Sequence, residues 1–361
     1  SDVTPAPAAA SRQVPARFVT TRYQGSKQRS FDLLERALSP LAFDSAVDVF
    51  GGTGAVSWLF KRWGKRVHFN DRFRWCREVG AALIENGSTR LAESAARKLF
   101  EREPGERYDD FVARTFEGVF YLPDENRWLD VVAQNLARMP DPVERALARY
   151  ALFQACLKKR PFNLFHRANL AVRTRDVRRT FGNKATWERP FGDLFLEALA
   201  EANAAVFDNG REHVATCLDA ADCPLDADLV YLDPPYVRSD GAAFDYLDGY
   251  HFLEGLVEYA DWPYRIDTSR KHRPYRQAPS PFAHRRTAPA ALAELVSRAA
   301  SARFVVISYR ADGVPSIAGL EAMLSAANRH VTRHERPINY ALSNRASSEV
   351  VLVGERSATK R

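Results

Sequence analysis

The apolar run 228–232 is followed directly by Asp233, Pro234, Pro235 and Tyr236. An amino group on a nucleobase is a poor nucleophile because its lone pair is delocalised into the ring. If the Asp233 carboxylate and the Pro234 carbonyl each accept one amino hydrogen, the nitrogen becomes more tetrahedral and its lone pair points at an alkyl donor. The prolines stiffen the backbone, and Tyr236 offers a ring against which an extruded base can stack. The tetrad therefore predicts alkylation of an exocyclic amine, although an ordinary proline turn is the alternative.

A glycine-rich turn forms a second candidate site, with Asp48, Phe50, Gly51, Gly52, Thr53 and Gly54 as its candidate cofactor-binding residues. Small residues where a strand turns into a helix let a ligand approach the backbone and the helix N-terminus. Asp71 ends the next apolar run, where a carboxylate could accept both hydroxyls of a ribose. Turn and acid predict a nucleoside-containing ligand. A dinucleotide is disfavoured because Ser57 stands where the third glycine of that pattern belongs.

Buried parallel strands would bring these two sites together. Near-continuous apolar runs predict strands at 46–50, 66–71, 228–232, 303–308 and 349–353. The first two flank a helical segment, which makes a βαβ unit. The pattern predicts a three-layer α/β, Rossmann-like domain.

The remaining segments differ from this pattern in composition. Residues 1–17, rich in Ala, Pro and Ser, predict a disordered lead-in. Residues 86–188 have helical periodicity and predict a mostly helical insertion, so the expected catalytic domain comprises 18–85 and 189–356. Residues 238–290, dense in Tyr, His, Pro and Arg, predict a long irregular excursion.

Positive charge is concentrated in two segments. Of the net charge of +7, residues 156–190 carry +8 and residues 262–286 carry +6, which leaves −7 for the rest of the chain. Such segments predict a polyanionic partner because phosphate neutralisation dominates nucleic-acid affinity, although ordinary solvated faces are the alternative. The candidate DNA-binding cations are Lys158, Lys159, Arg160, Arg167, Arg173, Arg175, Arg178, Arg179, Lys184, Arg270, Lys271 and Arg273.

The tetrad, the glycine turn and the early run Arg22-Tyr23-Gln24-Gly25-Ser26-Lys27 resemble the Dam-like (D12-class) DNA adenine-N6 methyltransferases. The order of early motif, cofactor loop, insertion and tetrad resembles that family too. The resemblance implies a methyltransferase that uses S-adenosyl-L-methionine, with double-stranded DNA as its partner. It also implies that the tetrad holds the target amino group, and that Tyr23, Lys27 and Asp219 join the glycine turn and Asp71 in binding the cofactor.

Other functions stay open at this point. An N4-cytosine DNA methyltransferase would use the same geometry, although an aspartate at the head of the tetrad favours adenine. RNA or protein is a less favoured substrate, because the basic insertion lies where the family keeps its DNA-reading segment. A catalytically silent DNA-binding protein of the same fold is disfavoured by the intact tetrad, and a dehydrogenase-like protein by the missing third glycine.

Composition excludes several other classes of protein. With 46% hydrophobic and 27% charged residues the chain is typical of soluble globular proteins. No apolar run approaches the ~18 residues that a membrane helix needs, and no secretory signal is visible, so we expect no membrane partner and a cytoplasmic location. The cysteines Cys76, Cys156, Cys217 and Cys223 form no ligand or disulfide pattern, so we expect no metal. We also expect a monomer in the free state.

Overall fold

The computed structural model describes residues 14–19, 27–175, 184–339 and 346–358. Within them lies a mixed sheet with the strand order β3-β2-β1-β4-β5-β7-β6, in which β7 runs antiparallel to both of its neighbours and the other described pairs are parallel. The strands are β1 (Ser45–Asp48), β2 (Arg66–Asp71), β3 (Val214–Cys217), β4 (Leu229–Leu232), β5 (Phe304–Arg310), β6 (Arg329–Asn339) and β7 (Ala346–Arg356).

Both faces of the central strands are buried. On β4, Leu229 and Tyr231 pack into one core cluster, whereas Val230 and Leu232 pack into another. The first cluster includes side chains of α1 (Phe31–Leu38), α2 (Ala55–Arg62) and α3 (Arg74–Gly80), and the second those of α12 (Ala288–Arg298) and α13 (Ile317–Ala326). Because successive side chains of a strand point to opposite faces, this pattern makes three layers. The predicted α/β architecture is confirmed.

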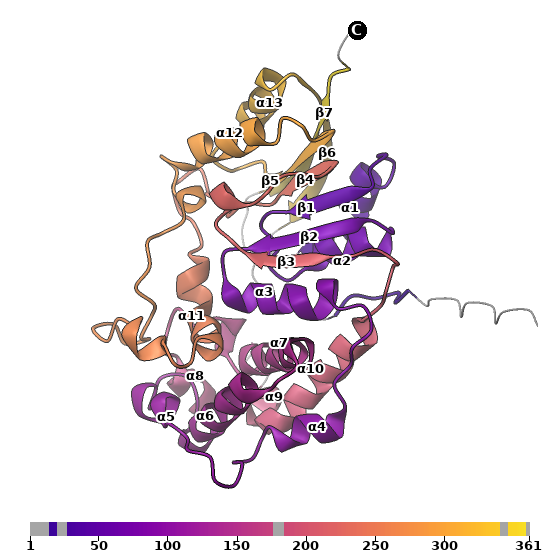
Figure 1. Cartoon of the computed structure of the whole chain (residues 1–361). Coiled ribbons are helices and arrows are strands. Elements are labelled where there is room, and N and C mark those ends of the chain that lie inside the picture. The colour runs from indigo at the N-terminus through magenta and orange to yellow at the C-terminus, as the bar shows by residue number, and fades with distance from the viewer. Residues whose placement is uncertain (1–13, 20–26, 176–183, 340–345, 359–361) are drawn as a thin grey trace, which may run out of the picture.

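A helical body packs against α3 on the side away from the sheet (Figure 1). Its helices are α4 (Glu93–Lys98), α5 (Phe111–Thr115), α6 (Pro123–Arg138), α7 (Pro142–Lys158), α8 (Leu170–Thr174), α9 (Lys184–Glu188) and α10 (Phe191–Ala205). Since α10 packs along α7, helices from both sides of residue 188 contribute to this body. The limits of the insertion remain a prediction.

The segment 238–290 is more ordered than the sequence indicates. It contains α11 (Tyr246–Val257) and the short turns η5 (Trp262–Tyr264) and η6 (Pro281–Ala283). Asp245 caps α11, accepting hydrogen bonds from the backbone N–H groups of Leu247 and Asp248. α11 also contacts both α3 and α6, so it joins the sheet layer to the helical body.

The strand order reverses between β1 and β4. From β1 the chain passes to β2 on one side, and it later returns to β4 on the other side of β1. In open parallel sheets, ligands bind outside the carboxyl ends of the strands at such a switch point. The glycine turn follows β1 and the tetrad follows β4, so both lie at this crevice.

Candidate functional site

The catalytic candidate Asp233 shares a lysine with a second carboxylate. It is the first residue after β4, and its Oδ1 lies 3.4 Å from Nζ of Lys27, which begins the short helix η1 (Lys27–Ser30). The same Nζ lies 3.3 Å from Oε1 of Glu349 on β7. The structure thus brings the early motif, the tetrad and the last strand together around one ammonium group.

The ionisation of Asp233 is finely balanced. Burial raises the pKa of its carboxyl group, Lys27 partly offsets this, and the carboxylate of Glu349 raises it further, so that the pKa is about 6. The group is therefore mostly ionised near pH 7 yet titrates close to physiological pH. In its ionised form it is an acceptor for amino hydrogens.

Asp71, predicted to accept ribose hydroxyls, lies at the end of β2 and also holds the glycine turn. Its Oδ2 accepts a hydrogen bond of 2.9 Å from the backbone N–H of Gly52, and its Oδ1 accepts one of 3.0 Å from Phe73. Gly54, the N-cap residue of α2, has a φ of +77°, a conformation that favours glycine. A Cβ at Gly51 would lie 2.2 Å from the ring of Phe69. The backbone of the turn therefore passes close to β2, where no side chain would fit at position 51.

Asp48, the last residue of β1, leaves one buried oxygen available. Its Oδ2 accepts a hydrogen bond of 2.8 Å from Ser57 Oγ, whereas its Oδ1 has no hydrogen-bond partner among the described residues. Burial raises the pKa of Asp48 to about 7, Ser57 opposes this, and the carboxylates of Asp233 and Asp71 add to it. Three carboxyl groups thus crowd one edge of the sheet, an arrangement that fits a cationic ligand with hydroxyl groups.

Asn70 is a site residue that the sequence analysis missed. Its Nδ2 donates to the carbonyl oxygens of Val49 and Leu218, at 3.1 Å and 3.0 Å, and its Oδ1 accepts from the backbone N–H of Leu218 at 3.1 Å. These bonds tie together the ends of β1, β2 and β3. They fix the turn that carries Asp219, whose exposed side chain lies at the same edge of the sheet. An asparagine next to the acid that ends a strand was the available signal.

The tetrad is anchored to the end of β5. The ring of Tyr236 packs against Tyr309, with centroids 5.7 Å apart, and beneath the guanidinium of Arg310 at 4.8 Å. The backbone N–H of Val314 donates to the carbonyl of Val237 at 2.8 Å. Pro234 is buried and Pro235 partly so. These contacts limit the freedom of the loop that carries Asp233.

The second missed residue, Glu254, lies on α11. Its carboxylate accepts hydrogen bonds from the backbone N–H groups of Arg74 and Trp75, at 3.2 Å and 2.9 Å, at the N-terminus of α3. Burial raises its pKa to about 7, against the effect of these two bonds. Tyr246, at the start of the same helix, interacts electrostatically with Asp233 and Asp71. α11 is thereby fixed beside the crevice.

The candidate DNA-binding cations divide by exposure. The exposed ones are Arg167, Arg175, Lys184, Arg270 and Lys271, and Lys158 and Arg273 are partly buried. Arg178 and Arg179 lie outside the described residues, as does the cofactor candidate Tyr23. The other three, Lys159, Arg160 and Arg173, are buried.

These three buried cations hold the helical body together. Lys159 and Arg173 both pair with Glu125, at 2.9 Å and 2.6 Å. Arg160 donates to the carbonyl oxygens of Leu164 and Arg167, and its guanidinium lies over the ring of Phe120. A side chain that satisfies buried acceptors cannot also reach a phosphate. We therefore correct the prediction for Lys159, Arg160 and Arg173 and leave them out of the DNA surface.

Two of the exposed candidate cations, Arg270 and Lys271, lie on a loop that we call the basic hairpin, residues 265–276. Its two arms are joined by an antiparallel bridge between Ile266 and Tyr275. His272 anchors it to α11, with Nε2 at 2.7 Å from Oδ1 of Asp248. Arg270 and Lys271 are exposed on it. The hairpin is therefore held to α11 by His272 and exposes the positive charges of Arg270 and Lys271 to solvent.

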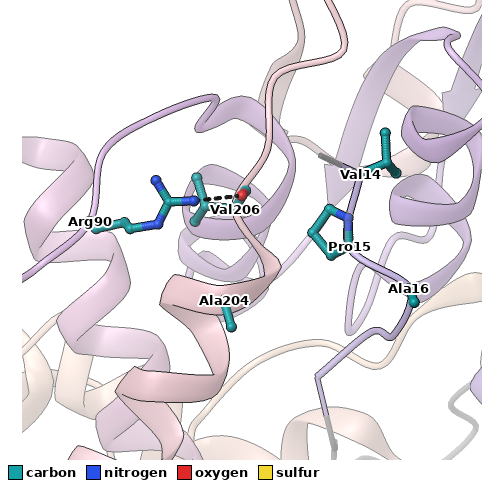
Figure 2. Close-up of a pocket in the computed structure, with 6 residues that line it drawn as sticks. All are labelled: Val14, Pro15, Ala16, Arg90, Ala204 and Val206. Carbon is teal, nitrogen blue, oxygen red and sulfur yellow. Dashed lines mark hydrogen bonds between the residues drawn. The ribbon is translucent and has the colours of Figure 1, made fainter. Parts of the chain in front are cut away.

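A surface pocket lies apart from these groups, between residues 14–16 and the end of α10 (Figure 2). Its lining residues are Val14, Pro15, Ala16, Arg90, Ala204 and Val206. Arg90 closes one side by donating to the carbonyl of Val206 at 3.1 Å. None of the candidate site residues that the structure describes lines this pocket.

Two kinds of feature are absent from the part of the chain that the structure describes. No helix in it is long and apolar enough to cross a membrane. Within the same residues, no group of three or more His, Cys, Asp or Glu side chains is arranged to hold a metal ion.

Comparison with known proteins agrees with the geometry. The model of the family described as D12 class N6 adenine-specific DNA methyltransferase matches residues 23–255. The Type II methyltransferase M2.HphI of Haemophilus parahaemolyticus is 25% identical over 340 residues, which cover 92% of this chain and 95% of that protein.

The Type II methyltransferase M.FokI of Planomicrobium okeanokoites is 24% identical over 322 residues, which are 84% of this chain and 47% of that protein. The chain thus spans about half the length of this second relative. The family match runs from the early motif through the glycine turn to the tetrad and α11, which are the segments that meet at the crevice. The chain therefore belongs to the D12 class of N6 adenine-specific DNA methyltransferases.

Proposed function

We propose that this methyltransferase uses S-adenosyl-L-methionine to methylate N6 of an adenine extruded from double-stranded DNA, within a short recognition sequence. One observation carries the proposal. Asp233 and the glycine turn follow adjacent strands at the switch point of the sheet, and the carboxylate of Asp233 lies next to Lys27 of the early motif. A donor held after β1 and an acceptor held after β4 would meet there.

The cofactor site would be built from the ends of β1 and β2. Asp71 has lone pairs left to accept ribose hydroxyls, and the turn 51–54 lets the ligand approach the backbone. The carboxyl groups at this edge, including the Asp48 oxygen that has no hydrogen-bond partner among the described residues, favour a ligand that carries positive charge. When bound, the cofactor supplies a methyl group on a positively charged sulfur, which keeps the electron pair of the broken bond.

The tetrad would orient the nucleophile. Asp233 and the Pro234 carbonyl would each accept one hydrogen of the adenine amino group, which turns its lone pair toward the methyl carbon. The new nitrogen–carbon bond forms as the sulfur–carbon bond breaks. The methylated amine then loses one of its hydrogens as a proton, so Asp233 need not be a strong base. Adenine is favoured over cytosine N4 by the family match and by the aspartate at position 233.

The DNA surface would comprise the exposed cations of both basic segments. Arg167, Arg175 and Lys184 belong to the helical body, and Arg270 and Lys271 to the basic hairpin. Most protein–DNA hydrogen bonds go to phosphates and fix position. These cations would therefore position the duplex, and the similarity to Type II methyltransferases suggests a role within restriction-modification.

A direct experiment tests the reaction. The chain is incubated with S-adenosyl-L-methionine labelled in its methyl group and with DNA of mixed sequence, and the DNA is digested to nucleosides. Label is expected in N6-methyl-2′-deoxyadenosine and in no other nucleoside. Label in N4-methyl-2′-deoxycytidine would show that the chain methylates cytosine N4 instead of adenine N6. If the cofactor binds but no DNA is labelled, the chain would be a catalytically silent DNA-binding protein.

The basic hairpin gives a quantitative prediction. In the Arg270→Ala, Lys271→Ala double variant, the slope of log K against log salt for DNA binding should become shallower by about 2, since each phosphate contact contributes roughly 0.9. Fluorescence anisotropy at four salt concentrations measures it. The control is Lys98→Ala, Arg102→Ala, which removes the same charge from the last residue of α4 and from an exposed residue four positions after it. Figure 1 shows α4 on a side of the helical body away from the segment that carries the hairpin. Equal slopes for the two variants would remove the hairpin from the DNA surface.

A further inference from the structure

We propose that Glu349 is a positioning residue for the methylation, and that it takes over the ammonium of Lys27 when the target amino group occupies Asp233. This inference rests on the proposed function of the tetrad. It concerns a residue outside the matched segment 23–255, on the last strand of the sheet.

The geometry shows one ammonium between two carboxylates. Nζ of Lys27 lies 3.4 Å from Oδ1 of Asp233 and 3.3 Å from Oε1 of Glu349. The two distances are nearly equal, so a small movement of the lysine side chain exchanges one partner for the other. The Lys27 side chain is 15% exposed, that of Asp233 is 21% exposed and that of Glu349 is 7% exposed. An uncompensated charge at this depth is costly, which keeps the ammonium with a carboxylate.

Within the part of the chain that the structure describes, Glu349 has more side-chain partners than Asp233. Ser30 Oγ lies 2.5 Å from its Oε1 and 2.6 Å from its Oε2, so one hydroxyl hydrogen is shared between both oxygens. Nη2 of Arg336, on β6, is 3.5 Å from Oε2. In the sheet, Glu349 is paired with Arg310 of β5. A carboxylate that side chains of η1 and β6 already contact, on a residue held in the sheet between β5 and β6, can receive the ammonium without moving itself.

The charge states fit this role. Burial would raise the pKa of Glu349, but Lys27 and Ser30 outweigh it and the pKa is lowered. Burial would lower the pKa of Lys27, but Asp233 and Glu349 outweigh it and the pKa is raised. Glu349 is therefore anionic and Lys27 cationic across the range in which Asp233 titrates. Asp48, Tyr231 and Tyr246 also interact electrostatically with Asp233.

The consequence concerns the oxygens of Asp233. If Glu349 were absent, the ammonium of Lys27 would pair with Asp233 alone and would occupy an oxygen that must accept an amino hydrogen. Glu349 offers the ammonium another anion at the same distance. The adenine amino group can then displace Lys27 from Asp233 without leaving a buried cation unpaired.

A double-mutant cycle tests the inference, with Glu349→Gln, Lys27→Met and both together. Glu349→Gln is expected to lower kcat about tenfold or more while leaving the KM for DNA and the Tm nearly unchanged. In the Lys27→Met background the same change should cost less than about twofold, because Glu349 acts through the ammonium. Glu349→Asp should restore part of the lost rate, since the anion is kept.

The acid limb of the pH profile is a second readout. Removing the negative charge of Glu349 removes a cause that raises the pKa of Asp233, so the limb of kcat/KM should move below its starting value near pH 6. The matched control is Glu78→Gln on α3, which removes another buried carboxylate, paired with Arg149 at 3.1 Å, and should not move the limb.

The outcomes separate two failures. If the unmodified chain does not methylate adenine, the proposed function fails. If it does methylate adenine, two results would contradict the role of Glu349. In the first, Glu349→Gln changes neither kcat nor the acid limb of the pH profile. In the second, Glu349→Gln lowers kcat by the same factor in the unmodified chain and in Lys27→Met.

Discussion

The Asp233→Ala variant is expected to lose methyl transfer by about three orders of magnitude or more while binding the cofactor nearly as well as the unmodified chain. The carboxylate stands at the end of β4, where under the proposed function it would face the base, whereas the cofactor would contact the ends of β1 and β2. Removing it leaves the amino group with one acceptor in place of two. Single-turnover methyl incorporation and calorimetric titration of the cofactor measure the two effects separately.

A control variant in the loop that follows the tetrad separates the loss of Asp233 from a general disturbance of that loop. Asp240→Ala removes an exposed carboxylate seven residues further on, paired with Arg238 at 2.9 Å, and should keep nearly full activity. Asp233→Asn retains one acceptor oxygen but not the charge, so its rate of methyl transfer should lie between those of Asp233→Ala and Asp240→Ala. Equal losses of transfer and of cofactor affinity in Asp233→Ala would contradict the assignment of this carboxylate to the base.

Glu125→Ala should be the most destabilising single change in the helical body, by about 3–5 kcal/mol, because it leaves two buried cations without their anion. The carboxylate of Glu125 pairs with Lys159 at the end of α7 and with Arg173 on α8. It also accepts a hydrogen bond of 3.0 Å from the backbone N–H of Leu122 at the start of α6. Chemical denaturation followed by tryptophan fluorescence gives the free energy of unfolding.

An exposed pair provides the contrast. Glu93→Ala breaks the pair with Arg97 on α4, where both side chains are about 60% exposed, and should change the free energy of unfolding by less than about 0.5 kcal/mol. If the two variants were destabilised equally, the burial of the Glu125 cluster would not control the stability of the helical body. Hydrogen exchange should also show faster opening of α6, α7 and α8 in Glu125→Ala.

The central sheet was predictable because its strands are buried on both faces. Expected strands coincide with β1, β2, β4, β5 and β7, and the two acids that end β1 and β2 lie at the expected edge. Two strands were missed. β3 is short and begins with the exposed Val214, and β6 is an edge strand that mixes charged residues and Pro337 with its apolar ones. Neither has the continuous apolar run by which the others were predicted.

The side-chain partners were harder to predict than the strands. A count of basic residues does not distinguish Arg160, buried against Phe120, from the exposed Arg167 seven residues later. Which cations are buried depends on acids elsewhere in the chain, such as Glu125. Glu349 likewise meets Lys27 across 322 positions of sequence, because β7 lies next to β5. The strand β7 could be predicted, but the contact between its residue Glu349 and Lys27 could not.

The reversed direction of β7 bears on how the protein can be extended. Its residue Glu349 stands opposite Arg310, at the catalytic rim, whereas Glu355 stands opposite Phe304, where β5 enters the sheet. The described residues after Arg356 therefore lie at the far rim of the sheet, at the yellow end of the ribbon in Figure 1. A domain fused there, for example a programmable DNA-targeting domain, would lie away from the crevice and would not block the access of duplex DNA to Asp233.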